Sequence, residues 1–143
     1  MFSGKSLQCE AKPKNIISSS NKKRKLDGSG NFTDYTHKRL DKDLRNDLQM
    51  LVSGFVDGKL IYILEFPFNY TDFKNRLKEQ LNKKFPKGDR EGFYLRSANF
   101  NYKHFENCSE LKIIYCLDKN DLEVYKNFIQ KNLLEILFKG VSK

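Results

Sequence analysis

The sequence predicts an α+β fold: a small antiparallel sheet of three to four strands, covered on one face by two helices. Three observations predict it. Apolar side chains stand at every second position over 60–66 and 111–117, which indicates strands; these are Leu60, Tyr62, Leu64 and Phe66, and Leu111, Ile113, Tyr115 and Leu117. Between them, apolar residues recur every four positions from Phe73 to Phe85, which indicates a helix. Residues 119–138 contain no Gly or Pro and repeat apolar residues with a helical period, which predicts a second, long helix.

The first 35 residues are expected to form a disordered basic tail, and residues 36–143 a single folded domain. The tail is rich in Ser, Lys, Asn and Gly, and its scattered apolar residues cannot offset the entropy of ordering it. Residues 1–25 carry seven basic residues and one acidic residue, which is +6 of the chain's net charge of +9. The basic run in the tail is typical of a nuclear-import signal or a phosphate-contacting arm, or it only keeps the tail soluble. It consists of Lys22, Lys23, Arg24 and Lys25.

A thin amphipathic helix and a strand hairpin are expected next, so the predicted element order is (α-β)-β-α-β-β-α. Thr36 is the expected N-cap of this helix. Its apolar stripe is formed by Leu40, Leu44 and Leu48. The Asp57-Gly58 pair between two apolar runs predicts a hairpin turn, with an edge strand at 49–56 before it.

The helix after Pro67 is expected to begin at an N-cap formed by Asn69 or Thr71 and to end before Pro86. Its core face is formed by Phe73, Leu77, Leu81 and Phe85. A solvated loop at 86–92 then leads to a strand near 93–102. In the last predicted helix, the apolar stretch 133–138 is open to a second interpretation, as a final strand.

The residue patterns favour a binding or assembly subunit over an enzyme, with no catalytic residue, cofactor or metal. The two histidines are far apart and the three cysteines show no CxxC spacing, which argues against a zinc site. No nucleophile-elbow, zinc-protease or P-loop motif occurs. The odd cysteine count and the absence of a signal-peptide pattern are typical of an intracellular protein. No apolar run is long enough for a membrane span.

The last helix is predicted to carry more apolar surface than one packing face can use. Besides its main stripe it holds Val124, Phe128, Leu134, Leu137 and Phe138. A helix that is apolar on two faces needs a second partner, either the thin helix of the same domain or another protein. A small sheet covered on one side also leaves one face and one strand edge unpartnered. Both features indicate homo- or hetero-oligomerisation.

Two strand-to-helix corners and the order of elements carry a family resemblance. The stretches concerned are "ILEFPF", "YTDFKNRLKEQL", "NFNY", "ELKIIYCLDKNDLEVYKNFI" and "LLEIL". They resemble the small Pcc/L-antigen family subunit of the KEOPS (EKC) tRNA-modification complex. The family's two corners are matched by Phe66-Pro67-Phe68 and by Asp118, Leu122 and Asn127. Cys116 and Glu123 depart from the family, which usually has Ala and Arg there.

The resemblance implies a non-catalytic assembly or dimerisation subunit of a complex that makes threonylcarbamoyladenosine in tRNA. The implied partners are the catalytic ATPase-fold subunit and either another small subunit or a second copy of the chain. The subunit would assist tRNA binding, in the cytoplasm and nucleus. The side chains expected to contact the catalytic subunit are Phe73, Leu77, Leu122, Tyr125, Ile129 and Leu133.

Two other functions stay open at this point. In a nucleic-acid-binding protein, the tail would contact phosphates and aromatic side chains would stack on bases across an open sheet face. Those aromatics are Tyr94, Phe100, Tyr102 and Tyr115. In a ubiquitin-like interaction domain of the PB1 kind, residues 133–138 would instead form the closing strand.

Overall fold

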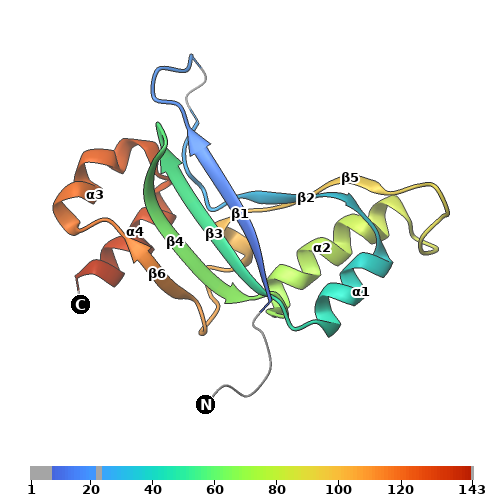
Figure 1. Ribbon diagram of the computed structural model, residues 1–143. Coiled ribbons are helices and arrows are strands. Elements are labelled where there is room, and N and C mark those ends of the chain that lie inside the picture. Colours follow the sequence, from blue (N-terminus) through green and yellow to red (C-terminus); the bar gives the residue numbers. More distant parts are fainter. Residues whose placement is uncertain (1–7, 22–23, 143) are drawn as a thin grey trace.

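The computed structural model describes residues 8–21 and 24–142, and it confirms the predicted α+β class. The described chain forms a four-stranded sheet, a two-stranded ribbon and four α-helices (Figure 1). In chain order the elements are β1 (Cys9–Ile16), β2 (Gly30–Tyr35), α1 (His37–Arg45), β3 (Gln49–Val56), β4 (Lys59–Pro67), α2 (Thr71–Lys84), β5 (Leu95–Phe100), the 3-10 turn η1 (Tyr102–His104), β6 (Lys112–Cys116), α3 (Lys119–Tyr125), the 3-10 turn η2 (Lys126–Phe128) and α4 (Lys131–Val141).

The four-stranded sheet has the order β1-β3-β4-β6 and is mixed, because β1 runs parallel to β3 while the other neighbours are antiparallel. The predicted hairpin joins β3 to β4. Asp57 and Gly58 both have positive φ there, 48° and 79°, as a type I′ turn requires. β3 was expected at the edge of the sheet. It is central instead, because the N-terminal residues add β1 outside it.

Residues 9–16 and 30–35 are strands, which corrects the expected disorder of the first 35 residues. β1 is in register with the whole of β3, from Cys9 opposite Gln49 to the end of both strands. β2 pairs with β5 in the two-stranded ribbon. Composition misled because a lysine in a strand can pack its stem against apolar side chains and pair its ammonium inside the protein. The Lys12 ammonium lies 3.0 Å from the Glu10 carboxylate and 4.3 Å from the centre of the Phe32 ring.

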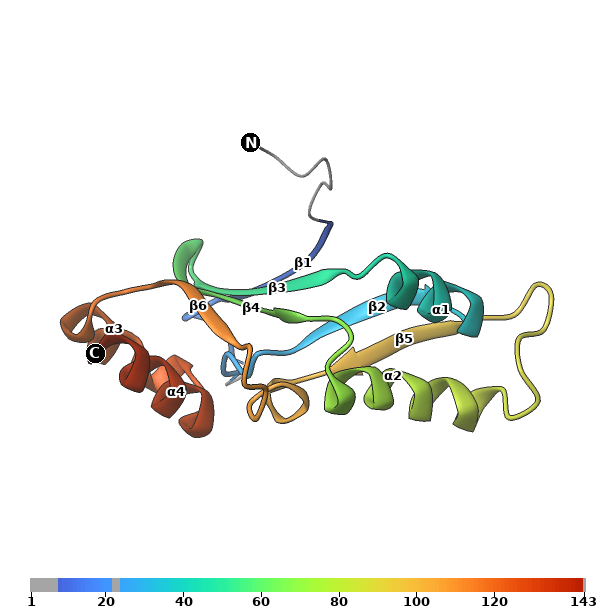
Figure 2. The same ribbon diagram turned by 90° about the horizontal axis from the view of Figure 1, so that it is seen from below.

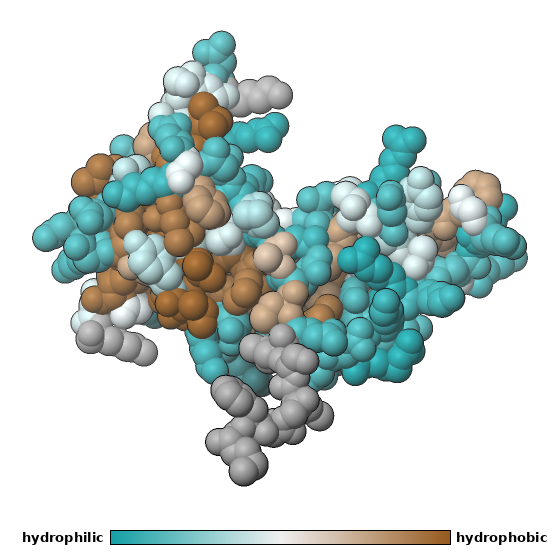
Figure 3. Space-filling view, viewed as in Figure 1, coloured by the Kyte–Doolittle hydropathy of each residue, from teal (hydrophilic) through white to brown (hydrophobic). Residues whose placement is uncertain are grey.

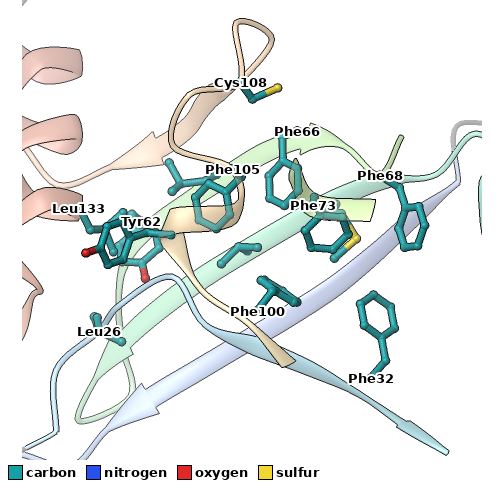
Figure 4. Packing of buried hydrophobic residues seen from close by; sticks show 14 of the residues in the cluster. Leu26, Phe32, Tyr62, Phe66, Phe68, Phe73, Phe100, Phe105, Cys108 and Leu133 are labelled. Atoms are coloured by element: carbon teal, nitrogen blue, oxygen red, sulfur yellow. The ribbon is translucent and has the colours of Figure 1, made fainter. Parts of the chain in front are cut away.

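One core lies between the four-stranded sheet and a second layer formed by the ribbon, α2 and α4 (Figure 2). The α2 core face is confirmed, since Phe73, Leu77 and Leu81 are fully buried and Phe85 is 6% exposed. Phe73 is central to the aromatic part of this core, which Figure 4 shows. Its ring makes edge contacts with three others, at centroid distances of 4.9–5.3 Å, namely Phe66, Phe68 and Phe100.

The helix starts agree with the sequence at α1 and differ at α2. Thr36 caps α1, since its side chain accepts a hydrogen bond from the N–H of Arg39 at 3.1 Å. At α2 the N-cap is Tyr70, and no side chain caps that end. Asn69 instead uses its amide oxygen to accept from the Lys74 ammonium at 3.0 Å. Neither Asn69 nor Thr71 is therefore the cap that local pattern predicted.

The long helix predicted over 119–138 is two helices, α3 and α4, separated by η2 and by Ile129. Ile129 is extended, with φ −122° and ψ 134°. A distant segment bonds to the chain there, because the N–H of Leu26 donates to the carbonyl of Phe128 at 2.7 Å. The N–H of Gln130 donates in turn to the carbonyl of Leu26 at 2.8 Å. The helical ladder is replaced at this point by a short parallel bridge.

Residues 133–138 belong to α4 and are helical, so their interpretation as a strand is wrong. A PB1-like domain closed by a strand at this position is wrong for the same reason. α4 begins at Gln130, whose side-chain oxygen accepts from the N–H groups of Asn132 and Leu133 at 2.7 and 3.1 Å. This cap restarts the helix immediately after the extended residue.

Candidate protein-interaction surface

The face of the four-stranded sheet that points away from the core is uncovered by any described element (Figures 1 and 2). On β3, for example, Met50 and Val52 point into the core while Leu51 and Phe55 are half-buried on the other side. We call this other side the outer face. Its apolar members include Ala11, Pro13, Leu51, Phe55, Leu60, Ile63 and Tyr115. Figure 3 shows apolar side chains gathered over the region of β3, β4 and β6.

Strand register aligns the outer-face residues in rows across the sheet. One row is free of charge and consists of Pro13, Ser53, Ile63 and Tyr115. The next row consists of Ala11, Leu51, Glu65 and Lys112, with opposite charges on the neighbouring strands β4 and β6. Glu65 and Lys112 are the charged residues at the outward positions of the four described strands of this sheet, so the outer face carries no net charge. The chain as a whole has a net charge of +9.

The two edges of the sheet are poorer surfaces for a partner than the outer face. On the β1 edge, Pro13 removes a backbone donor and Lys12 and Lys14 flank it, both of which are known ways of blocking strand addition. The β6 edge is five residues long, and its pairing with β4 is interrupted by a register shift between Ile63 and Leu64. A short, bulged strand also discourages strand addition. The outer face is therefore the larger regular surface open to a partner.

Five of the six side chains expected to contact a catalytic subunit lie in the chain's own core. Their exposed fractions are 0% for Phe73, Leu77, Leu122 and Leu133, and 2% for Ile129. Tyr125 alone is half-buried, with the Lys59 ammonium 5.7 Å from the centre of its ring. These five side chains stabilise the fold, and a partner that docks on α3 and α4 has to use others. The most exposed large apolar side chain among the described residues is that of Val124 on α3, at 70%.

Most of the apolar side chains that were expected beyond the main stripe of the last helix pack inside the molecule. Leu137 is fully buried, and three further side chains pack half-buried against the core, namely Phe128, Leu134 and Phe138. The N-terminal part of the chain also packs against this segment, because the fully buried Leu26 forms a bridge to Ile129.

The aromatic residues expected on one open sheet face lie in three different places. Phe100 and Tyr102 are buried, with 2% and 6% exposure, so their rings cannot stack on a base. Tyr115 is 42% exposed on the outer face. Tyr94 is 48% exposed on the loop that precedes β5. In the basic run, Arg24 and Lys25 are exposed, and its other two members, Lys22 and Lys23, lie outside the described residues.

Two polar networks join elements across the domain, and sequence patterns indicated neither. The buried Asp43 of α1 accepts a hydrogen bond from the Tyr35 hydroxyl at 3.1 Å and lies 3.8 Å from the Arg39 guanidinium. Burial raises the pKa of Tyr35 and, against the hydrogen bond and the nearby arginine, that of Asp43. In the second network, the His37 imidazole bridges Asp89 and Asn82, at 2.8 Å from each. Apart from the Arg39–Asp43 pair within α1, the partners lie on different elements, so their spacing in the sequence gives no local signal.

Two cysteine thiols in the described part of the chain are made poorer nucleophiles by their surroundings. Burial raises the pKa of the Cys116 thiol to about 11 and also raises that of Cys108, which is the opposite of nucleophile activation. Among the residues described, no group of three or more His, Cys, Asp or Glu side chains could hold a metal ion. Nor does any helix in those ranges have the length and apolar character needed to cross a membrane.

Comparisons of the chain with protein-family models, with curated proteins and with solved structures found no match in any of the three.

Proposed function

We propose that this chain is a non-catalytic interaction subunit that dimerises with a second copy of itself through the outer face. The observation that carries the proposal is the uncovered, neutral and largely apolar outer face on a chain of charge +9. An isologous contact sets the same patch against itself, so a neutral patch can close where charged surfaces would repel. The opposite charges of Glu65 and Lys112 can also meet across such a two-fold axis.

The geometry of the outer face suits sheet-on-sheet packing. Two sheets that pack face to face interdigitate side chains over a spacing of about 10 Å. The row of Pro13, Ser53, Ile63 and Tyr115 would lie at the centre of that contact and the charged pair toward its rim. A non-polar centre with a polar rim is the usual anatomy of a protein interface.

We propose, further, that the assembly is of the KEOPS type, with the catalytic ATPase-fold subunit as its other partner and assistance to tRNA binding as its contribution. Two corners support this proposal. Phe66 and Phe68 are fully buried on either side of Pro67, where β4 turns toward α2. Asp118 caps α3 by accepting from the N–H of Asp121 at 2.8 Å. Both corners have the strand-to-helix form on which the family resemblance depends.

The dimer is tested by sedimentation velocity on the purified chain. We expect a dimer for the natural sequence and a monomer for Ile63→Glu, because that change places a charge at the centre of the outer face. Val124→Glu is the matched control: it exchanges an apolar for an acidic residue on α3, away from the outer face, and should stay dimeric. A monomeric natural chain would refute the dimer, and so would an Ile63→Glu variant that remains folded and dimeric.

The contact with a catalytic subunit is tested by co-purification with the ATPase-fold subunit of the same organism. Val124→Glu should weaken this association, while Ile63→Glu should preserve it. The two variants thus separate the two interfaces. Failure of the natural chain to co-purify with that subunit would exclude the KEOPS assignment and leave the dimer proposal to its own test.

A further inference from the structure

The two-stranded ribbon of β2 and β5 presents a polar, exposed surface, which we call the ribbon face. Its residues are Asn31, Thr33, Ser97 and Asn99, all exposed and paired across the ribbon in register. The amide of Asn31 donates to the Ser97 hydroxyl at 3.1 Å. The opposite side of the ribbon is buried, with Phe32 and Ala98 at 0% exposure. The ribbon face is thus a small patch of neutral hydrogen-bonding groups, about 7 Å long along the strands at the usual rise per strand residue.

A groove lies at one end of the ribbon face, where β1 passes near β2 and β5. Its volume is about 560 Å³, and residues of the ribbon face line it together with Lys14, Ser29 and Asn101. The Lys14 ammonium lies 2.6 Å from the Ser29 hydroxyl and 3.8 Å from the Asp27 carboxylate. The groove therefore combines the Lys14–Asp27 ion pair with several neutral donors and acceptors.

An exposed loop with aromatic and basic side chains lies at the other end of the ribbon face, at residues 86–94 (Figure 1). Phe93 is 55% exposed and Tyr94 is 48% exposed. A turn sets Arg90 beside Phe93, since the N–H of Phe93 donates to the Arg90 carbonyl at 3.0 Å and the guanidinium lies 4.7 Å from the ring centre. Further exposed cations on or beside the loop are Lys83, Lys84, Lys87 and Arg96.

Both the loop and the ribbon are held in place by hydrogen bonds. Asp89 of the loop accepts from the N–H groups of His37 and Lys38, at 2.8 and 2.9 Å. The free edge of β5 is covered by Gln80 of α2, whose side-chain amide exchanges two hydrogen bonds with the backbone of Asn99, at 3.0 and 2.9 Å. Because Gln80 occupies the edge of β5, a ligand would bind to the ribbon face.

We infer that the ribbon face and the loop 86–94 together bind single-stranded nucleic acid. Exposed aromatic rings stack on bases of any sequence, and basic side chains beside them contact phosphates. Asn, Ser and Thr side chains match the donors and acceptors of base edges. Phe93 and Tyr94 supply the stacking, Lys87 and Arg90 the phosphate contacts, and the ribbon face the polar floor. This inference is independent of the proposed dimer, which uses the opposite layer of the molecule.

An anionic lipid surface is the other partner that a loop with aromatic and basic residues can fit. The ribbon face argues for nucleic acid, because a patch of amides and hydroxyls offers nothing to the apolar part of a membrane.

The test measures fluorescence anisotropy of a labelled single-stranded RNA of mixed sequence, about 12 nucleotides long, which is within the usual site sizes of such proteins. The double variant Phe93→Ala, Tyr94→Ala should bind about tenfold or more weakly, as expected for the loss of stacking. Ile17→Ala removes a similarly exposed apolar side chain that lies outside both the ribbon face and the loop, and should bind like the natural chain. Lys87→Gln, Arg90→Gln should reduce the salt dependence of binding, whereas Lys119→Gln, Lys139→Gln should preserve it.

The same anisotropy measurement tests whether the basic run binds RNA, and binding to vesicles tests the lipid alternative. Arg24→Gln, Lys25→Gln should bind RNA within about twofold of the natural chain, because the inference places the main contacts on the loop. If this variant loses binding while the aromatic double variant retains it, the inference is wrong. Absence of RNA binding by the natural chain would also overturn it, and so would binding only to phosphatidylserine vesicles. Circular dichroism of each variant separates lost contacts from lost folding.

Discussion

Leu26 and Ile129 are neighbours in a parallel bridge that joins segments from opposite ends of the chain. Leu26 is fully buried and Ile129 is 2% exposed. The backbone of Leu26 donates to the residue before Ile129 and accepts from the residue after it, at 2.7 and 2.8 Å. These two hydrogen bonds satisfy backbone groups that become free where the helical ladder stops. The N-terminal segment is therefore a structural part of the C-terminal helix pair.

We expect Leu26→Ala to destabilise the protein by about 2–5 kcal/mol, the usual cost of truncating a fully buried leucine. The loss comes from the apolar contacts, since the backbone bridge does not need the side chain. The free energy of unfolding in urea measures it. Ile17→Ala is the control: Ile17 lies nearby in sequence but is 50% exposed, so its change should stay within about 0.5 kcal/mol. Equal effects of the two variants would contradict the structural role of Leu26.

Elements with a strong local period were predictable from sequence, and the bridge shows why others were not. The positions of α2, β4 and β6 follow from alternation or four-residue spacing. On β6 the predicted common face of Ile113 and Tyr115 is wrong, because the register shift sets Ile113 opposite the buried Leu64 and Tyr115 opposite Ile63 on the outer face. On β4 the predicted alternation applies from Tyr62 to Phe66, but Ile61 is buried as well, since the register with β3 shifts opposite Gly54 and Phe55. The break between α3 and α4 depends on Leu26, more than one hundred positions away. No window around Ile129 contains that information.

The candidate surfaces were predictable only in part, for a related reason. Apolar residues at helical spacing, such as Leu122 and Leu133, mark the core of the chain itself before they mark any interface. The open sheet face was predicted because helices were expected to cover only one side of the sheet. Which side chains that face presents depends on the register with β1, and the composition of the N-terminal residues did not indicate a strand there. Tyr94 was a candidate for stacking, whereas Phe93 was not, because exposure on a loop has no periodic signal.

We expect Gln130→Ala to cost about 1 kcal/mol, the typical loss for a side-chain N-cap. The variant leaves two N–H groups at the start of α4 without their partner and also removes the 3.2 Å hydrogen bond to the Tyr102 hydroxyl. Asn127→Ala, on the exposed surface of η2, should change stability by less than about 0.5 kcal/mol. Thermal unfolding followed by circular dichroism compares them. A neutral Gln130→Ala would show that water replaces the cap without loss.

Gly54→Ala should destabilise the protein, because the added methyl group would meet the Tyr62 ring at 2.5–2.8 Å. Tyr62 is 1% exposed and cannot move aside without disturbing the core. Overpacking of this kind costs about 1–3 kcal/mol. Ser53→Ala, one residue earlier and facing outward, should be close to neutral, and urea unfolding of the two variants tests the difference. Equal stability of Gly54→Ala and the natural chain would mean that β3 shifts freely at its bulge.

The His37 imidazole should make the stability of the protein depend on pH. Burial alone lowers the pKa of His37, but hydrogen bonds to Asn82 and Asp89 and the charge of Asp89 raise it overall. Burial alone raises the pKa of Asp89, but hydrogen bonds from Lys38 and His37 and the charge of the imidazole lower it overall. Both ring nitrogens face acceptor oxygens at 2.8 Å, which suits the doubly protonated ring.

The sign of the pH effect follows from these two directions. The stability from His37 is complete below its unfolded pKa of about 6.5 and is lost as pH rises through its raised folded pKa. The stability from Asp89 is complete above its unfolded pKa of about 3.9 and is lost as pH falls through its lowered folded pKa. The pair therefore stabilises the attachment of the loop to α1 most between about pH 4 and 6.5.

We expect the difference in unfolding free energy between the natural chain and His37→Gln to be largest in that range and to shrink as pH rises above 7. His104→Gln is an informative control, because burial and the charge of Arg76 lower the pKa of His104. Its contribution should run the other way and be lost as pH falls. Urea unfolding at a series of pH values measures both. A His37 contribution that grows with pH would contradict a charged His37–Asp89 pair.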